Sequence, residues 1–277
     1  MKLSVFFLYC LRLAEQKGIS VKDALKYVRL LGYEGIDIDK NELIEYPFAV
    51  EYINECGLKI CNVYGEYDVV GGLDKNVNDL VDYAVTCGAK NAMVLTGLFS
   101  KDTFNKSLIN NREKMLEFLD DNEDALRVAN TLKESVDYAT KKGVSLTVED
   151  VGSHYAITSY ISQIEWLFNK VDGLKFTFDT GNFYLNGQDV LSAFELFGDK
   201  TTHVHCKDFL LKPEVNSSDF SYAKISTAIG MGACPISKLV SFFIEKGYDG
   251  FFTTEYLGVE NVENILIESS NYFKSLR

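Results

Sequence analysis

The chain has 277 residues, of which 47% are hydrophobic, and it carries a formal net charge of −12. Its length is enough for one large core or two small ones. Because an acidic surface of this size repels phosphates and anionic lipids, neither nucleic acid nor a membrane is expected as a partner. No apolar stretch approaches the roughly 20 residues that a membrane-spanning helix needs.

The cysteines and the first residues predict a cytoplasmic location. Six cysteines are present without a Cys-x-x-Cys pair, which argues against a zinc knuckle or a redox motif and fits a reducing compartment. The apolar start is interrupted by Arg12 and Glu15, and no small-x-small cleavage site follows. We therefore expect a buried first strand there and not a signal peptide.

Strand-like and helix-like segments alternate along the first half of the chain. Apolar runs predict strands over 2–8, 35–39, 59–67 and 91–97. Apolar residues at intervals of three and four predict helices over 21–32, 48–57, 76–88 and about 111–142. Ser20 suits the N-cap of the first of these helices and Gly32 suits its end.

The second half repeats the alternation. Strands are predicted over 144–150, 175–182 and 251–258, and in the stretch THVHCKDF that holds His203 and His205. Helices are predicted over 161–171, 189–198, 236–247 and 260–276, and a long polar loop from 210 to about 235. A loop of this length in a compact domain suggests a lid over a functional site.

Eight strands, each followed by a helix or a long connection, predict a (β/α)₈ TIM barrel that forms a single domain over residues 1–277. An open doubly wound sheet is the alternative. It is disfavoured because no Gly-x-Gly-x-x-Gly follows the first strand and no Gly- or Pro-rich linker divides the chain.

Four polar residues fall at the carboxyl ends of the last four predicted strands, where TIM barrels carry their active sites. They are Glu149, Asp179, His205 and Glu255. Charged groups buried in a barrel mouth are costly unless they are paired or bind a metal. Three carboxylates and an imidazole suit one divalent ion, such as Mn²⁺, Co²⁺, Mg²⁺ or Zn²⁺. The alternative is unrelated strand-end carboxylates and a hydrogen-bonded core histidine.

Alternation along a strand places His203, His205 and Lys207 on the same face. His205, nearer the mouth, is predicted to be the metal ligand. His203 is expected one layer deeper, where it would hydrogen-bond a ligand carboxylate. Lys207 is expected at the rim, where it could meet an anionic oxygen of the substrate.

The ordered set of motifs LTVED, FDTGN, HVHCKD, IGMG and GYDGFFTTEY, together with GYEGIDID near the front, resembles the sugar phosphate isomerase/epimerase superfamily of xylose isomerase-like barrels. The resemblance covers nearly the whole chain. It implies that Glu149, Asp179, His205 and Glu255 bind one divalent metal. It also implies that the two glutamates are the acid/base pair on opposite faces of the substrate carbon, with an enediolate stabilised by the metal.

Two positions depart from the family pattern. Many members have His three residues after the metal-binding Asp, where this chain has Asn182, and Asn cannot shuttle a proton at neutral pH. Epimerases of free ketoses often have Arg six residues after the metal-binding His, where this chain has Leu211 beside Lys212. Both departures weigh against a ketose 3-epimerase and leave the broader isomerase prediction in place.

Further residues are candidates for contact with a small carbohydrate substrate. Asn182 and Lys207 are predicted substrate ligands, as is Glu66, which ends the third strand. His154 could reach over the mouth or be an exposed loop residue. Tyr64 and Phe7 could stack on a sugar ring or belong to the core.

Four functions are compatible with such a barrel. The first is a metal-dependent isomerase or epimerase of a sugar, sugar phosphate or keto-polyol. The second is a metal-assisted inosose-type dehydratase or lyase, which shares the proton abstraction but expels a hydroxyl. A non-catalytic sugar-binding barrel and an apurinic endonuclease are the others, and three histidines with a net charge of −12 disfavour the endonuclease. A homo-oligomer is possible.

Overall fold

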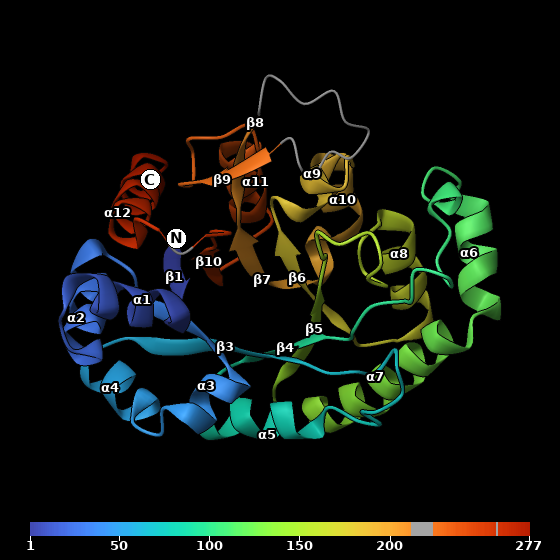
Figure 1. The fold of residues 1–277 in the computed structure, drawn as a ribbon, viewed down its shortest axis with the longest axis horizontal. Coiled ribbons are helices and arrows are strands. Elements are labelled where there is room, and N and C mark those ends of the chain that lie inside the picture. The colour runs from blue at the N-terminus through green and yellow to red at the C-terminus, as the bar shows by residue number, and fades with distance from the viewer. Residues whose placement is uncertain (212–223, 259) are drawn as a thin grey trace.

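A computed structural model describes residues 1–211, 224–258 and 260–277, and its eight parallel barrel strands close into a ring (Figure 1). Their order around the ring is β1-β10-β7-β6-β5-β4-β3-β2. The barrel strands are β1 (Lys2–Phe6), β2 (Gly35–Asp39), β3 (Lys59–Glu66), β4 (Asn91–Leu95), β5 (Ser145–Glu149), β6 (Lys175–Asp179), β7 (Thr201–Cys206) and β10 (Phe251–Thr254). The predicted TIM barrel is confirmed, and the open sheet is excluded.

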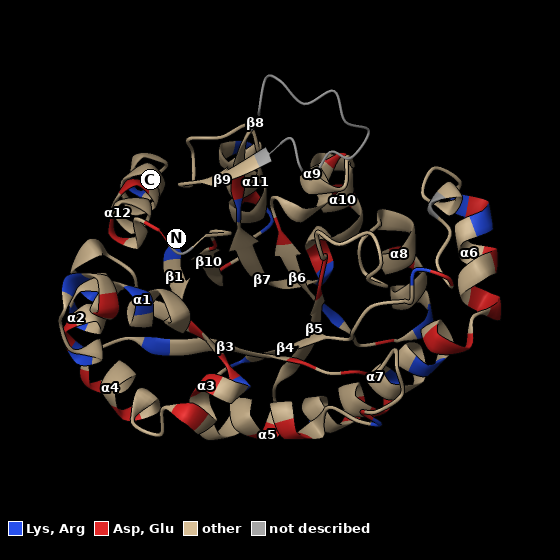
Figure 2. Cartoon of the chain, viewed as in Figure 1, with Lys and Arg blue, Asp and Glu red and all other residues tan. Residues whose placement is uncertain are grey.

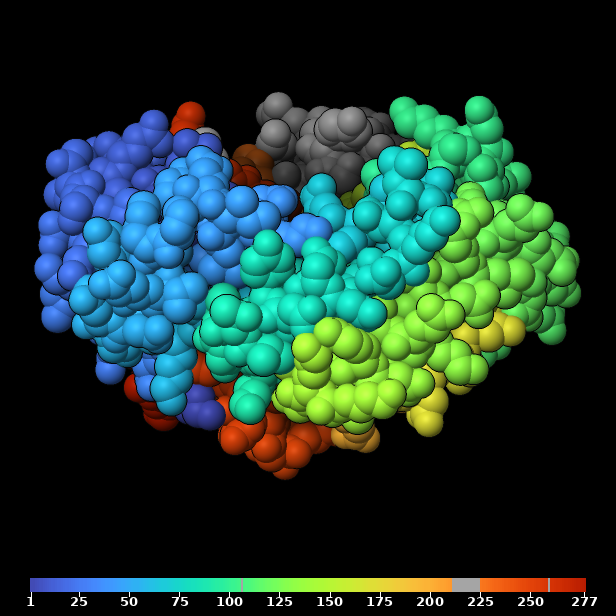
Figure 3. Space-filling view, turned by 90° about the horizontal axis from the view of Figure 1, so that it is seen from below, coloured from blue at the N-terminus to red at the C-terminus, as the bar shows by residue number. Residues whose placement is uncertain are grey.

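Helices surround the barrel (Figure 1), and charged residues of both signs are spread over the outer ones (Figure 2). In the face that Figure 3 shows, the segments that contain α4, α5 and α7 lie side by side. The α-helices are α1 (Phe7–Lys17), α2 (Val21–Leu31), α3 (Lys40–Glu45), α4 (Ala49–Glu55), α5 (Asn78–Cys87), α6 (Arg112–Asp121), α7 (Glu123–Lys141), α8 (Ile161–Lys170), α9 (Asn182–Leu185), α10 (Val190–Phe197), α11 (Ile236–Glu245) and α12 (Val262–Ser275). The 3₁₀ turns are η1 (Lys106–Leu108) and η2 (Gly198–Lys200). Within the described residues, no helix is long and apolar enough to span a bilayer.

The caps of α2 are confirmed, and two other predicted elements are wrong in extent. Ser20 Oγ accepts a hydrogen bond from Asp23 N at 3.1 Å, and Gly32 has a φ of 102°. The helix predicted over 111–142 is two helices, because Asn122 ends α6 and its side chain accepts a hydrogen bond from Ala125 N that caps α7. The first strand is shorter than predicted, since α1 begins directly at Phe7.

The stretch after β7 also differs from the prediction. The strand ends at Cys206, and β8 (Asp208–Leu211) pairs antiparallel with β9 (Lys224–Thr227) in a separate two-stranded sheet. Residues 212–223 of the predicted lid lie outside the described residues.

The IGMG turn, which follows β9, is held by the buried carboxylate of Asp208. That carboxylate accepts hydrogen bonds from the backbone N–H groups of Gly230 and Gly232, both at 2.9 Å, and of Cys234 at 3.0 Å. A Cβ at position 232 would collide with the Asp208 carboxylate, so the close approach requires glycine. These amides bind an internal carboxylate and therefore do not form a free phosphate cradle.

The barrel interior is polar below the mouth, and the apolar core lies between the barrel and the helices. Ser4 and Thr253 hydrogen-bond at 2.7 Å inside the barrel, and Thr147 and Thr177 do so at 2.8 Å. On the outer face of β6, the ring of Phe178 packs against Phe243 of α11, with centroids 5.4 Å apart. The outer core therefore fixes the strands, while their inward side chains remain available for polar chemistry.

Candidate metal centre

The four predicted ligands converge at the carboxyl ends of four neighbouring strands. One ligand atom from each of Glu149, Asp179, His205 and Glu255 lies within 4.8 Å of every other. In the strand register Asp179 is the partner of His205, and Glu255 N donates a hydrogen bond to Cys206 O at 2.8 Å. The parallel register thus brings together residues that are far apart in the sequence.

Two cations contact the three carboxylates of this cluster. His205 Nδ1 lies 2.6 Å from Glu149 Oε1 and 3.2 Å from Glu255 Oε2. Lys207 Nζ lies 2.8 Å from Glu255 Oε1 and 3.4 Å from Asp179 Oδ2. Lys207 is only 3% exposed, so it is buried beside the cluster and does not lie at an open rim as expected, and it places a positive charge there.

The pKa values of the cluster are strongly perturbed. Burial raises the pKa of Asp179 to about 7, although Lys207 opposes this shift. Burial also acts to raise the pKa of Glu255, but Lys207 and His205 outweigh it and lower that pKa to about 2. Burial acts to lower the pKa of Lys207, yet Asp179 and Glu255 raise it well above its usual value. The acidic groups therefore depend on positive charge placed among them.

The donor atoms of the cluster fit a divalent ion. Asp179 Oδ1 accepts hydrogen bonds from the backbone N–H groups of Gly181 and Asn182, both at 2.7 Å. Its other oxygen, Oδ2, and Glu255 Oε2 are buried without a well-aligned hydrogen bond, and their charged neighbours are Lys207 Nζ at 3.4 Å and His205 Nδ1 at 3.2 Å. Such oxygens, together with an imidazole nitrogen, are the ligands that Mn²⁺, Co²⁺, Zn²⁺ or Mg²⁺ takes.

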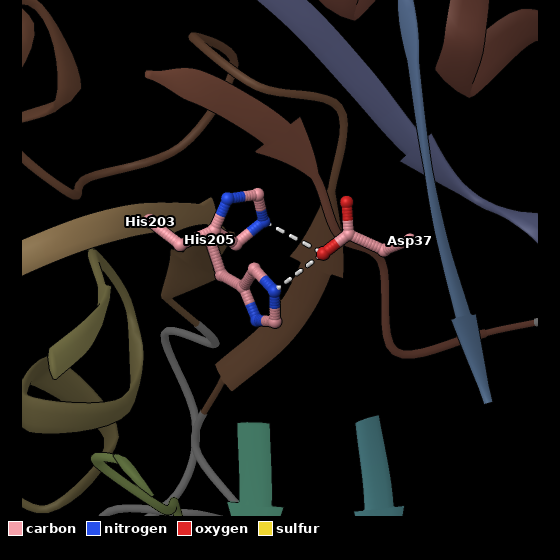
Figure 4. Close-up of side chains that lie close together, drawn as sticks. All are labelled: Asp37, His203 and His205. Carbon is pink, nitrogen blue, oxygen red and sulfur yellow. Dashed lines mark hydrogen bonds and ion pairs between the residues drawn. The ribbon is translucent and has the colours of Figure 1, made fainter. Parts of the chain in front are cut away.

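Asp37, a fully buried carboxylate on β2, is a site residue that was not predicted from the sequence. Figure 4 shows it facing both histidines: Asp37 Oδ2 lies 2.7 Å from His203 Nε2 and 3.1 Å from His205 Nε2. The prediction that His203 contacts a ligand carboxylate is therefore wrong: its partner is Asp37, which is not one of the four predicted metal ligands. The available signal was an aspartate in the middle of the buried run GIDID.

Asn182 is buried beside the cluster and both ends of its amide are engaged. Its Oδ1 accepts a hydrogen bond from Lys207 Nζ at 3.1 Å, and its Nδ2 donates to Asp150 O at 2.6 Å. This arrangement orients the Lys207 ammonium. Contact of Asn182 or Lys207 with substrate stays a prediction.

The remaining candidates lie on neighbouring loops and strands. Glu66 is exposed and lines a cavity of about 680 Å³ at the carboxyl ends of β3, β4 and β5. His154 is half-buried, and its Nδ1 lies 2.5 Å from Tyr160 Oη. Their roles in binding substrate stay predictions.

Of the two alternatives for Phe7, the structure bears out the core, and the ring of Phe6 lies beside the cluster. Phe7 is buried in α1, where its ring packs against that of Tyr46. The ring of Phe6 lies 5.0 Å from that of His205 and 5.4 Å from that of Tyr64. Ser4 and Phe6 point into the barrel, so alternation along β1 turns residue 7 outward, toward the apolar core.

Replacing Lys207 with methionine is expected to destabilise the metal-free protein by about 3–5 kcal/mol, because the buried Glu255 and Asp179 lose their cation. Urea unfolding in the presence of a chelator measures this loss, and added Mn²⁺ should restore part of it. Lys170→Met is the matched control: Lys170 forms an exposed pair with Asp120 at 2.8 Å, which water screens, so its loss should change the stability little. Equal losses in the two variants would contradict the inferred electrostatic role of Lys207.

Comparison with known proteins identifies the family. Residues 25–276 match the profile described as xylose isomerase-like TIM barrel, so the chain belongs to this family. An inosose dehydratase from Lacticaseibacillus casei is 21% identical over 258 residues, which cover 86% of this chain and 83% of the relative.

Solved structures share the same barrel. A D-allulose 3-epimerase from Methylomonas sp., in complex with D-allulose, superposes with a TM-score of 0.70 at 12% identity, covering 100% of this chain and 97% of the epimerase. The IOLI protein with a binding zinc atom superposes with a TM-score of 0.67 at 17% identity, covering 100% and 96% of the two chains. These likenesses establish the fold, on which dehydratases and epimerases both occur.

Proposed function

We propose that this protein is a divalent-metal-dependent isomerase or epimerase that acts on a small polyhydroxy carbonyl compound by proton abstraction next to the carbonyl. The observation that carries the proposal is the convergence of Glu149, Asp179, His205 and Glu255 within 4.8 Å at the carboxyl end of the barrel. The membership of the xylose isomerase-like family supports it. A cytoplasmic location and a homo-oligomeric state remain predictions.

The residues of the site support this chemistry. When bound, the divalent ion supplies Lewis-acid stabilisation of the oxyanion that develops during proton removal. Glu149 and Glu255 are the proposed acid and base, one removing the proton and the other returning a proton to the opposite face. Lys207, oriented by Asn182, places a positive charge beside Glu255 and so stabilises negative charge at the reacting end.

The neighbouring cavity favours an uncharged substrate. The charged side chains that line it are Glu66, Asp68 and Asp74, and none of its described lining residues is Lys or Arg. An anionic group would be repelled there, whereas hydroxyl groups could donate hydrogen bonds to the carboxylates. We therefore propose a neutral ketose or keto-polyol in preference to a sugar phosphate.

Exchange with solvent deuterium tests the proposed reaction. The Mn²⁺-loaded protein is incubated in D₂O with neutral ketoses, keto-inositols and their phosphorylated counterparts, and the sugars are analysed by NMR and mass spectrometry. We expect deuterium next to the carbonyl in recovered neutral substrate and its isomer, and loss of exchange after chelation. Absence of exchange from every compound would contradict the isomerase or epimerase proposal.

A dehydratase is the second candidate, because the similar protein from L. casei is described as an inosose dehydratase. Both reactions begin with the same proton abstraction. Accumulation of a dehydrated keto-inositol with no isomer would favour this candidate. The alternative of a non-catalytic sugar-binding barrel would be supported by binding of a ketose without exchange or product.

A further inference from the structure

Asp37 reaches the candidate metal centre from a strand that is not next to it. In the barrel order β1 and β10 lie between β2, which carries Asp37, and β7, which carries His203 and His205. The Asp37 side chain therefore points across the barrel interior, and Figure 4 shows one of its oxygens joined by dashed lines to both imidazole rings. All three side chains are fully buried.

Hydrogen bonds hold the Asp37 carboxylate from several sides. Besides the two histidines, Oδ2 lies 3.0 Å from Asn62 Nδ2, which donates to it. Oδ1 accepts a hydrogen bond from Thr253 Oγ1 at 3.1 Å, and Thr253 Oγ1 is also 2.9 Å from His203 Nε2. A carboxylate with this many donors has its orientation fixed, because any rotation leaves a buried donor unpaired.

The contact with Asp37 determines which nitrogen of His205 faces the cluster. Both ring nitrogens face carboxylate oxygens, which can only accept, so both carry a proton while no ion is bound. With an ion among the carboxylates of the cluster, Asp37 Oδ2, 3.1 Å from Nε2, would keep the proton on Nε2. Nδ1 is then the nitrogen available to a metal, and it is the atom that lies next to Glu149 and Glu255. A hydrogen-bond acceptor at the far ring nitrogen of a metal-ligating histidine fixes the orientation of the ring and raises the basicity of the ligating nitrogen.

We propose that Asp37 is a positioning residue for the metal centre: it fixes the ring of His205 so that Nδ1 faces the ion. It also hydrogen-bonds His203, which lies one layer deeper in the barrel. This inference rests on the proposed metal site. Asn62 and Thr253 also donate to the oxygens of Asp37, which favours this role over a separate ion among Asp37, His203 and His205.

Metal titration of Asp37→Asn tests the proposal without measuring activity. The substitution keeps the shape of the side chain but removes its charge and one acceptor. Calorimetry with Co²⁺ on the metal-free protein should show affinity about 10–100-fold lower than in the unaltered protein. The absorption spectrum of the bound Co²⁺ should also change. Asp39→Asn, on the same strand but at the cap of α3, is the control and should bind Co²⁺ normally.

Each outcome has a distinct meaning. Co²⁺ binding by Asp37→Asn with unchanged affinity and spectrum overturns the positioning role and leaves the proposed function standing. If the unaltered protein binds two equivalents of Co²⁺ and the variant binds one, then Asp37, His203 and His205 bind an ion themselves. No Co²⁺ binding by the unaltered protein defeats the proposed function itself.

A milder variant covers the case in which Asp37→Asn does not fold, as judged by circular dichroism. Thr253→Val removes one donor to Asp37 and keeps the carboxylate. It should lower the affinity for Co²⁺ in the same direction but by less. An affinity equal to that of the unaltered protein would overturn the proposal in that case.

Discussion

Replacing Glu149 or Glu255 with glutamine is expected to lower kcat by at least ~10²-fold, the scale of a lost general base. Glutamine keeps an oxygen where the carboxylate had one, but it cannot take up a proton from carbon. The two carboxylates contact the same His205 Nδ1, at 2.6 and 3.2 Å, so both stand at the reacting end of the site.

The experiment must separate a lost base from a lost metal ligand. Rates are therefore measured at saturating Mn²⁺, with the bound metal counted in each variant, and deuterium exchange is followed together with product formation. Glu51→Gln on the outer helix α4 is the control and should retain full activity. Full activity in both Glu149→Gln and Glu255→Gln would remove these residues from catalysis.

Replacing His205 with alanine is expected to abolish stoichiometric metal binding. The substitution removes the one nitrogen donor of the cluster and leaves three carboxylates whose buried oxygens have lost a cationic neighbour. Elemental analysis after loading with Mn²⁺ and gel filtration measures the bound metal. We expect about one equivalent in the unaltered protein, and far less in the variant, as a one-site cluster requires.

His154→Ala is the matched control for the loss of an imidazole. His154 lies against Tyr160 on the loop after β5 and is not a member of the cluster. This variant should keep its metal. One equivalent of metal in His205→Ala would show that the ion is held elsewhere.

The barrel and its four clustered ligands could be predicted from the sequence because both follow from local patterns. Apolar runs gave the strands, and a charged residue at the end of each of the last four strands marked Glu149, Asp179, His205 and Glu255. In a closed parallel barrel all such ends meet at one mouth, so no tertiary detail was needed.

Asp37 could not be placed in the same way. Its partners lie across the barrel interior, and the contact depends on the relative stagger of β2 and β7, which local alternation does not give. The β8–β9 hairpin and the break at Asn122 were missed for a related reason. A four-residue strand pair and a single capping side chain are weaker signals than the apolar periodicity that surrounds them.

The most direct test of the metal centre is anomalous diffraction from crystals grown with Mn²⁺, recorded at the manganese absorption edge. The ion should appear as a single peak, about 2.0–2.5 Å from Glu149, Asp179, Glu255 and Nδ1 of His205. A peak at any other place, or no peak among these four side chains at full loading, would contradict the account.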